Sequence, residues 1–397
     1  MSKTIQLLVL THNYPRHHGD HAGVFLGLLC RRLLDHSVQP IVLAPHDPGA
    51  PEYEENSGVR VHRFRYGTDQ QENLAYHGNM QAIVTSSLRG MLRFRTFHKQ
   101  FRRTAASMIE TEKIDVIAGH WLVPAAMVMK SLAERYPLPM ILSSHGTDIR
   151  LANKFGGLPY RYLRSTCRGL TRWTFVSSYL QDQILQLDPK LKDRLEVLPL
   201  PHDESVFYPD DSVEKRDGLT VAVTRFTQQK RVSYLIDAFA QVTHEVPEAR
   251  LELYGGGPLQ GEIERQIQSL DLTGKVIIHA PVSQAELRTI YNRASIVVLN
   301  SYREGFGMAL SEAMLCGTAV VGVASGGITD IIAHEQRGLL AAPDSVGSLA
   351  AAITRLLQDS SLRGRLAAAG NEYAQATYAS GPLAARYAQI VHDAASR

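Results

Sequence analysis

Cysteine is scarce in this sequence, with three residues in 397. Cys30, Cys167 and Cys316 are widely separated and none belongs to a Cys-x-x-Cys pair, which argues against a disulfide framework or a zinc site. Long apolar runs are also missing, because no segment reaches the roughly 18 apolar residues that a membrane span needs. The first apolar run, Ile5–Leu10, is too short for a signal peptide. We therefore expect a soluble cytoplasmic protein with reduced thiols.

The sequence also lacks a large excess of either charge, because its net charge is only +3. The two halves differ, however, with +8 for residues 1–200 and −5 for residues 201–397. A basic half can attract phosphates or anionic lipid headgroups, although a solvated surface without a partner has the same composition. The length suits two domains of roughly 150 to 200 residues, and a cleft between domains is the default place for a site.

Short runs rich in Val, Ile and Leu alternate with stretches of helical period, which predicts parallel strands covered by helices. The expected strands are Ile5–Leu10, Ile114–Ala118, Met140–Ser143, Leu219–Val223, Leu251–Tyr254, Val276–Ile278, Ile296–Leu299 and Ala319–Val321. The proline-rich and acidic stretch around residues 201–217 interrupts this alternation and is expected to be a linker. We predict an α/β fold of two Rossmann-like, doubly wound domains facing across a deep cleft, at residues 1–200 and 218–380. A C-terminal helix at 381–397 is expected to cross back to the first domain.

The most informative motif runs from Arg303 to Glu312, between an expected strand and an expected helix. The backbone amides of Phe306, Gly307 and Met308 can meet a phosphate at the positive end of the helix dipole. Ionised carboxylates accept hydrogen bonds from sugar and ribose hydroxyls, so Glu304 and Glu312 can hold a sugar nucleotide. Without further context, a loop acid and an exposed helix acid are the commoner explanation of such a pair.

The stretch from Ser301 to Gly317 resembles glycosyltransferase family 4, whose members are retaining, nucleotide-sugar-dependent enzymes with the GT-B fold. Residues Val221–Phe239 are similar to the segment that opens the second domain of that family. The resemblance implies that Arg225 and Lys230 hold the donor diphosphate. Two fixed cations can stabilise the leaving nucleotide as a divalent metal does in other enzymes. No convincing Asp-x-Asp or His-x-x-x-Glu pattern occurs, so neither a metal nor another cofactor is expected.

The same resemblance implies a donor site made largely of backbone. Ser325–Asp330 is similar to the family's Gly-Gly loop, with Asp330 in place of the more common Glu. Gly255 and Gly256 occupy a glycine turn near the nucleotide, and the backbone of Val282 is expected to meet the base. The donor-binding residues are then Glu312, Gly305, Phe306, Gly307, Met308, Gly255, Gly256, Val282, Gly326 and Gly327.

In the first half, Ser143–Asp148 is similar to the His-Gly-x-Asp turn of the family, which places His145 against the donor sugar. A histidine can donate or accept a hydrogen bond there. The resemblance implies a catalytic set of His145, Glu304, Arg225 and Lys230. It also implies acceptor-side roles for Gly23, His120 and Asp148, whereas Trp121 is expected to be a core residue.

Residues 89–103 hold seven cations, counting His98, among apolar side chains that include Met91, Leu92 and Phe94. A basic, aromatic helix of this kind can lie on an anionic bilayer. The other interpretation is a domain helix with one face in the core and one face in solvent. Nucleic-acid binding is not expected, because no recognition motif accompanies the charge.

The sequence therefore predicts a hexosyl-type transferase (EC 2.4) that moves a sugar from a nucleotide-sugar to a hydroxyl acceptor with retention. A lipid-linked or envelope polysaccharide acceptor at the cytoplasmic face of a membrane is the first expectation. The alternatives are a transferase for a soluble small acceptor such as a sugar phosphate, a nucleotide-sugar epimerase or phosphorylase of the same fold, and a catalytically silent binding module. The donor base, the donor sugar and the oligomeric state stay open.

Overall fold

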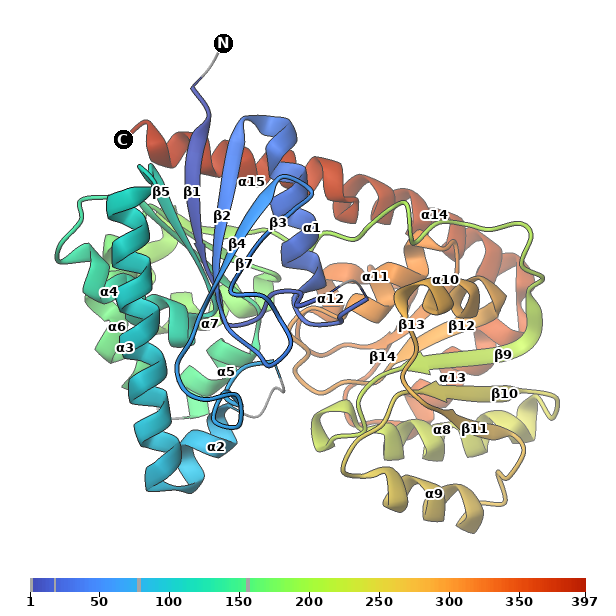
Figure 1. Ribbon diagram of the computed structural model, residues 1–397. Helices are drawn as coiled ribbons and strands as arrows, with labels where there is room; N and C mark the ends of the chain where they lie inside the picture. The colour runs from blue at the N-terminus through green and yellow to red at the C-terminus, as the bar shows by residue number, and fades with distance from the viewer. Residues whose placement is uncertain (1–2, 18, 77–79, 155–157) are drawn as a thin grey trace. The chain divides into compact units, whose positions relative to one another are not determined.

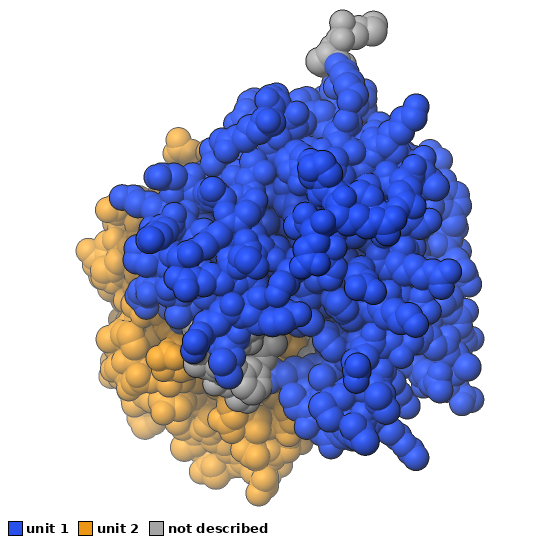
Figure 2. Space-filling view, turned by 90° about the vertical axis from the view of Figure 1, so that its left-hand side faces the viewer, with its two compact units in different colours: residues 1–201, 380–397 blue, residues 202–379 orange. Residues whose placement is uncertain are grey.

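The computed structural model describes residues 3–397 except 18, 77–79 and 155–157. The chain divides into two compact units (Figures 1 and 2). Unit 1 comprises residues 1–201 and 380–397, and unit 2 comprises residues 202–379. Each unit has its own sheet and its own buried core.

Unit 1 is built on an eight-stranded sheet with the order β3-β4-β2-β1-β5-β6-β7-β8. Only the pairing of β3 with β4 is antiparallel among the strand pairs that the structure describes. The inner strands read as nearly continuous apolar runs because helices cover both faces of the sheet. The strands are β1 Ile5–Leu10, β2 Val38–Pro45, β3 Tyr53–Asn56, β4 Val59–Phe64, β5 Val116–His120, β6 Met140–Ser144, β7 Arg172–Phe175 and β8 Leu195–Val197.

The helices of unit 1 pack on both faces of this sheet (Figure 1). On one face, α1 and the C-terminal α15 share a core with β1, in which Leu26, Leu29, Tyr387 and Val391 are buried. The helices are α1 Val24–Leu33, α2 Met80–Ser86, α3 Leu88–Thr111, the π-helical η2 Trp121–Ala126, α4 Met127–Ala133, α5 Thr147–Lys154, α6 Leu158–Gly169, α7 Ser178–Leu187 and α15 Ser380–Ala395, with short 3-10 turns η1 Leu34–His36 and η3 Pro189–Arg194.

Unit 2 has a six-stranded, fully parallel sheet with the order β11-β10-β9-β12-β13-β14. Its strands are β9 Arg216–Val223, β10 Arg250–Tyr254, β11 Val276–His279, β12 Ala294–Leu299, β13 Ala319–Val323 and β14 Leu339–Ala341. Its helices are the 3-10 turn η4 Gln228–Lys230, α8 Val232–Glu245, α9 Gln260–Ser269, α10 Gln284–Arg293, α11 Met308–Leu315, α12 Ile328–Ile331, α13 Val346–Gln358 and α14 Ser360–Tyr378. In a sheet of this topology, ligands bind beyond the carboxyl ends of the strands.

The segment expected to be a linker, residues 201–217, belongs almost entirely to unit 2. His202 is buried and its Nε2 lies 2.7 Å from Ser311 Oγ. Phe207 is buried too, and the amide of Asp210 donates to Asn292 Oδ1 at 2.8 Å. The prolines and acids of the segment do not predict these contacts, because the residues that His202 and Asp210 contact lie about 80 or more positions further along the chain.

The C-terminal helix α15 begins at Ser380, one residue before the start expected at residue 381. Pro382 lies in its first turn, where the missing N–H has no helical partner to lose. None of the helices in the described part of the chain is long and apolar enough to cross a membrane.

Helix α3 contains the basic aromatic stretch 89–103. Phe97 and Phe101 are fully buried and pack against Phe64, with ring centroids 5.1 and 4.7 Å apart. Met91 and Leu92 are 47% and 51% exposed. The helix therefore has a core face, as a domain helix should, and also presents apolar side chains to solvent near its N-terminus.

Candidate active site

The loops after β9, β10, β12 and β13 meet at one edge of the sheet in unit 2. The amide of Thr224 donates to the carbonyl of Tyr254 at 3.0 Å, which joins the first two loops. Gly327 donates to the carbonyl of Glu304 at 2.8 Å, which joins the last two. The parallel topology therefore gathers most of the predicted donor-binding residues, because the carboxyl ends of all these strands point the same way.

Lys230 and Glu304 are joined in an ion pair of 2.5 Å between Nζ and Oε2. Their side chains are only 17% and 12% exposed. Lys230 ends the 3-10 turn η4 after β9, and Glu304 lies between β12 and α11. The structure thus brings together two oppositely charged residues of the predicted catalytic set, and both side chains are largely shielded from solvent.

Two glycines allow the loops to approach this closely. Gly326 has φ +70°, and a Cβ on it would lie 2.2 Å from the carbonyl oxygen of Glu304. Gly255 has φ +147°, and its Cβ would lie 1.9 Å from the carbonyl oxygen of Thr224. Any side chain at either position would push the loops apart, so the backbone contact predicted for these glycines depends on their identity.

Helix α11 begins next to the ion pair. Its N-cap, Gly307, has φ +112° and offers no side-chain cap. The Leu310 amide donates to the carbonyl of Gly307 at 2.9 Å, whereas the earlier amides of the turn have no helical carbonyl before them to reach. The Gly305 amide lies 3.2 Å from Glu304 Oε1. Phe306 is buried, and its ring is stacked on His202 with centroids 6.2 Å apart. Only the backbone of Phe306 is therefore suited to the predicted donor contact.

Glu312 is buried rather than exposed, at 6%. The hydroxyl of Tyr291 donates to its Oε2 at 2.9 Å. Burial raises the pKa of Glu312 to about 7, and the bond from Tyr291 opposes that shift. The bond from Tyr291 uses one acceptor position of Oε2, and the carboxylate has further acceptor positions for the predicted contact with ribose hydroxyls.

The structure gives less support for two other predicted donor-binding residues, Arg225 and Val282. Arg225 is exposed and its guanidinium makes no hydrogen bond or ion pair with any residue that the structure describes. It lies in the same loop as Lys230, after β9. Val282 is partly buried in the connection between β11 and α10. Their predicted contacts with the diphosphate and the base stay predictions.

In unit 1, His120 and His145 are paired at the ends of β5 and β6. His120 Nδ1 lies 3.1 Å from His145 Nε2, and the rings are stacked with centroids 5.3 Å apart. Burial lowers the pKa of His145 to about 3 and that of His120 well below its usual value. Both imidazoles are neutral at neutral pH, so each can donate or accept a hydrogen bond but carries no charge.

Asp148 and Gly23 shape the loops of unit 1. The carboxylate of Asp148 is buried and accepts backbone N–H bonds from Gly146 at 3.0 Å and Leu122 at 2.9 Å. Gly23 has φ +63°, and a Cβ on it would lie 2.5 Å from the carbonyl oxygen of Asn13. Asp148 therefore fixes the turns after β5 and β6, and Gly23 closes the loop after β1. Whether they also contact an acceptor stays a prediction.

His12, which follows β1, joins the candidate site although it is not among the residues predicted from the sequence. Its ring meets the ring of Trp121 edge-on, with centroids 4.6 Å apart. Burial lowers its pKa to about 4, against the influence of Asp148. The signal was present, because His12 comes two residues after the first parallel strand, at the edge of the sheet where ligands bind.

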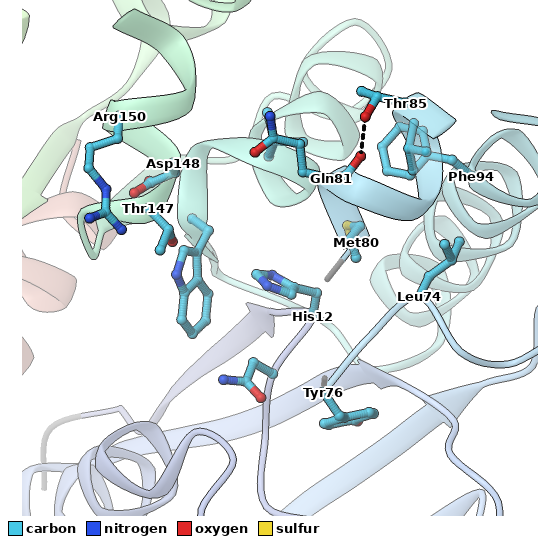
Figure 3. A pocket seen from close by; sticks show the side chains of 14 residues that line it. His12, Leu74, Tyr76, Met80, Gln81, Thr85, Phe94, Thr147, Asp148 and Arg150 are labelled. Atoms are coloured by element: carbon cyan, nitrogen blue, oxygen red, sulfur yellow. Dashed lines mark hydrogen bonds between the residues drawn. The ribbon is translucent and has the colours of Figure 1, made fainter. Parts of the chain in front are cut away.

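These residues adjoin a cavity of about 580 Å³ in unit 1 (Figure 3). One part of its wall is apolar and is formed by Leu74, Met80, Val84, Phe94, Trp121 and Val123. The polar part includes His12, Asn13, Thr147, Asp148 and Arg150. Trp121 is thus both a buried residue, at 7% exposure, and part of a cavity wall.

One group of side chains in the described part of the chain has the spacing of metal ligands, namely His46, Asp69 and Glu72. Arg65 already pairs with Asp69 at 2.6 Å and with Glu72 at 3.1 Å. His46 Nδ1 lies 2.6 Å from Glu72 Oε2. This cluster is a network of ion pairs with its own counter-charge, and it contains none of the predicted site residues.

Comparison with known proteins identifies relatives of the chain over most of its length. Residues 22–206 match the model of Glycosyltransferase Family 4, and residues 208–373 match that of Glycosyl transferases group 1. The chain is 24% identical over 348 residues to N-acetyl-alpha-D-glucosaminyl L-malate synthase of Bacillus anthracis, covering 85% of this chain and 90% of that protein. It is 30% identical over 282 residues to D-inositol 3-phosphate glycosyltransferase of Frankia alni, covering 64% and 68%. The structure of Anabaena HepE in complex with UDP-glucose is similar with a TM-score of 0.74 at 18% identity, covering 99% and 100%.

Two Rossmann-like α/β units with this loop arrangement define the GT-B fold of glycosyltransferases, as predicted. The chain belongs to glycosyltransferase family 4 and is a glycosyltransferase (EC 2.4). The predictions of family, fold class and enzyme class are thereby confirmed.

Proposed function

We propose that this enzyme transfers a sugar from a nucleotide-sugar to a hydroxyl acceptor, with retention of anomeric configuration and without a metal. The observation that supports the proposal most directly is the Lys230–Glu304 ion pair at the meeting point of the donor loops. Lys230 and Arg225 stabilise the charge that develops on the leaving diphosphate. Glu304 accepts hydrogen bonds from sugar hydroxyls, and Glu312 accepts them from the ribose.

The reaction requires positioning and electrostatic stabilisation more than covalent chemistry. The nucleotide departs, and the acceptor hydroxyl attacks from the same face of the sugar. No side-chain nucleophile is assigned to this step. His145, which is neutral because of its burial, acts as a hydrogen-bond partner of the donor sugar. His120 is 3.1 Å from it and orients its ring.

For the acceptor, we propose a lipid-linked glycan in envelope or extracellular polysaccharide assembly. The basic first half of the chain and the exposed Leu88, Met91 and Leu92 at the start of α3 support this choice. Arg89, Arg93 and Arg95 alternate with them, and such a surface binds anionic bilayers through both kinds of contact. The enzyme would then act on the cytoplasmic face of a membrane.

A soluble small acceptor is the second candidate. The relatives from Bacillus anthracis and Frankia alni are named for malate and for inositol phosphate, which are both small anions. Flotation with liposomes separates the two candidates. Binding of the wild-type protein to anionic vesicles at low salt, and its loss after charge reversal at Arg93, Arg95, Lys99 and Arg102, is expected for a lipid acceptor. Absence of binding at low salt favours the soluble one.

The donor is tested first by thermal shift with UDP-, GDP- and ADP-sugars, starting with UDP-glucose because HepE is described in complex with it. A ligand at about 100 times its dissociation constant stabilises a protein by roughly 2.7 kcal/mol. The anomeric configuration of the product, read by NMR, tests retention. An unchanged transfer rate in excess EDTA tests the absence of a metal requirement. Conversion of the donor without any acceptor would instead indicate an epimerase.

A further inference from the structure

The cavity of unit 1 has an unusual wall for a site that would receive a sugar alone. Met80 of α2, Phe94 of α3 and Leu74 contribute apolar side chains to it (Figure 3). Val84 of α2 lines it as well. The ring of Trp121 completes this surface, and Trp121 is held at φ +69° by the turn after β5. A strained backbone at a non-glycine residue persists only where the surroundings impose it, and such positions cluster at ligand sites.

Two buried polar atoms of cavity-lining residues lack a hydrogen-bond partner among the described residues. They are Nδ1 of His12 and Oδ1 of Asn13, both in the loop after β1. A buried polar atom without a partner costs about 1 to 3 kcal/mol, so it marks a place where a ligand group gains by binding. A hydroxyl can satisfy either atom, since it donates one hydrogen bond and accepts others.

The cavity also contains a cation. Arg150 lines it and has no side-chain hydrogen bond or ion pair with a residue that the structure describes. Asp148 lies in the same wall, but its two oxygens accept backbone N–H bonds from Gly146 and Leu122. The carboxylate of Asp148 is therefore already hydrogen-bonded to the backbone, whereas the guanidinium of Arg150 is available to a ligand.

We infer that this cavity takes an amphiphilic acceptor, with a hydrocarbon group against Val84 and Phe94, a hydroxyl at His12 and Asn13, and one anionic group at Arg150. The inference rests on the proposed function, and it adds the chemical class of the molecule that receives the sugar. A membrane lipid and a soluble amphiphile share this chemistry. A small polar acceptor such as malate would leave the apolar wall exposed to water.

Octyl phosphate is a suitable probe, because it can be compared with methyl phosphate, which has the same charge and no chain. Its binding is followed by the fluorescence of Trp121, since the other tryptophan, Trp173, is fully buried in β7. Each methylene that enters the cavity strengthens binding about fourfold. We expect octyl phosphate to bind at least a hundredfold tighter than methyl phosphate. Equal affinities, or no binding of octyl phosphate, would overturn the inference.

The matched variants are Val84→Asp, in the cavity wall, and Leu187→Asp, at a residue of α7 that is 39% exposed and does not line the cavity. We expect Val84→Asp to weaken octyl phosphate binding at least tenfold and Leu187→Asp to change it less than twofold. Val84→Ala provides a milder variant if Val84→Asp folds poorly. Arg150→Gln should weaken octyl phosphate but leave octyl glucoside unchanged. Similar losses in the wall and control variants would contradict the assignment.

Vesicles distinguish the two sources of the ligand. Trp121 emission that responds to octyl phosphate and to phosphatidic acid in phosphatidylcholine vesicles assigns a membrane lipid. A response to octyl phosphate alone assigns a soluble amphiphile. All these measurements omit the donor, so their failure is separate from failure of the proposed transfer. The thermal shift caused by a UDP-sugar should be the same in Val84→Asp as in the wild type.

Discussion

Lys230 and Glu304 form an ion pair, 2.5 Å between Nζ and Oε2, that connects the loop after β9 to the loop after β12. Their side chains are 17% and 12% exposed, so neither charge is fully hydrated. A partly desolvated pair is held in position before any ligand arrives, which reduces the reorganisation needed in the transition state. The pair therefore joins the two loops, and under the proposed function it also presents two charges to the donor.

Replacing either charge should impair transfer severely. A charge-assisted hydrogen bond contributes about 1.5 to 3 kcal/mol, so Lys230→Ala and Glu304→Ala are each expected to lower kcat/KM by roughly 10- to 150-fold. Initial rates with the donor identified by thermal shift measure this effect. Arg265→Ala is the control, because among the described residues the Arg265 side chain bonds only to the Gly261 carbonyl of its own helix, at 3.1 Å. Near wild-type rates in folded Lys230→Ala or Glu304→Ala would refute the donor assignment.

Gly326→Ala should disturb the same loops through the backbone. Its Cβ would lie 2.2 Å from the carbonyl oxygen of Glu304, and φ is +70°. We expect a lower melting temperature and a loss of the stabilisation caused by the donor. Gly364→Ala in α14 is the matched control, because its Cβ meets nothing within 4 Å and alanine favours a helix by about 1 kcal/mol. Equal melting temperatures for the two variants would show that the loops tolerate a side chain at Gly326.

Much of the fold follows from local sequence. The run Ile5–Leu10 is an expected strand and an observed one with the same bounds, because polar residues limit it on both sides. The resemblance to a family motif also places the loop residues Lys230 and Glu304 in one site. Their 2.5 Å contact follows from the parallel topology, since adjacent strands β9 and β12 bring their carboxyl ends together.

Features that depend on contacts between residues far apart in the sequence are not predicted by local sequence patterns. The burial of Glu312 depends on Tyr291, and nothing in the α11 sequence alone indicates that contact. The anchoring of residues 202–217 to unit 2 depends on Ser311 and Asn292, which composition does not reveal. His12 gains its significance from Trp121, more than one hundred residues later in the chain. In each case tertiary contacts, and not propensity, decide the outcome.

The raised pKa of Glu312 predicts a pH dependence of stability. In the folded protein this pKa is about 7, compared with its ordinary value of 4.5. Between those values the unfolded chain loses the proton and the folded protein keeps it, so Glu312 makes the free energy of unfolding fall as pH rises from 4.5 to 7. Glu312→Gln removes this effect. We expect the variant to gain roughly 3 kcal/mol relative to the wild type between pH 4 and pH 8.

Urea unfolding of both proteins at pH 4, 6 and 8 measures this difference. Gln keeps an oxygen that can accept the bond from the Tyr291 hydroxyl, so the comparison isolates ionisation from the loss of a hydrogen bond. Glu262→Gln, on the surface of α9, is the control and should follow the wild type at every pH. A difference between Glu312→Gln and the wild type that is the same at all three pH values would contradict the prediction.

His202 predicts a loss of stability in acid. Its pKa is lowered by burial from 6.5 to about 3, and its Nε2 is 2.7 Å from Ser311 Oγ. Below pH 6.5 the unfolded chain binds a proton that the folded protein does not, so the contribution of His202 to stability is present above pH 6.5 and is lost as pH falls toward 3. At pH 5 the loss is about 2 kcal/mol. Urea unfolding at pH 7.5 and pH 5 measures this loss. On going from pH 7.5 to pH 5, His202→Gln should lose less free energy of unfolding than the wild type. The control His21→Gln, at an exposed histidine, should lose as much as the wild type. Equal losses in all three proteins would mean that His202 takes up a proton without unfolding.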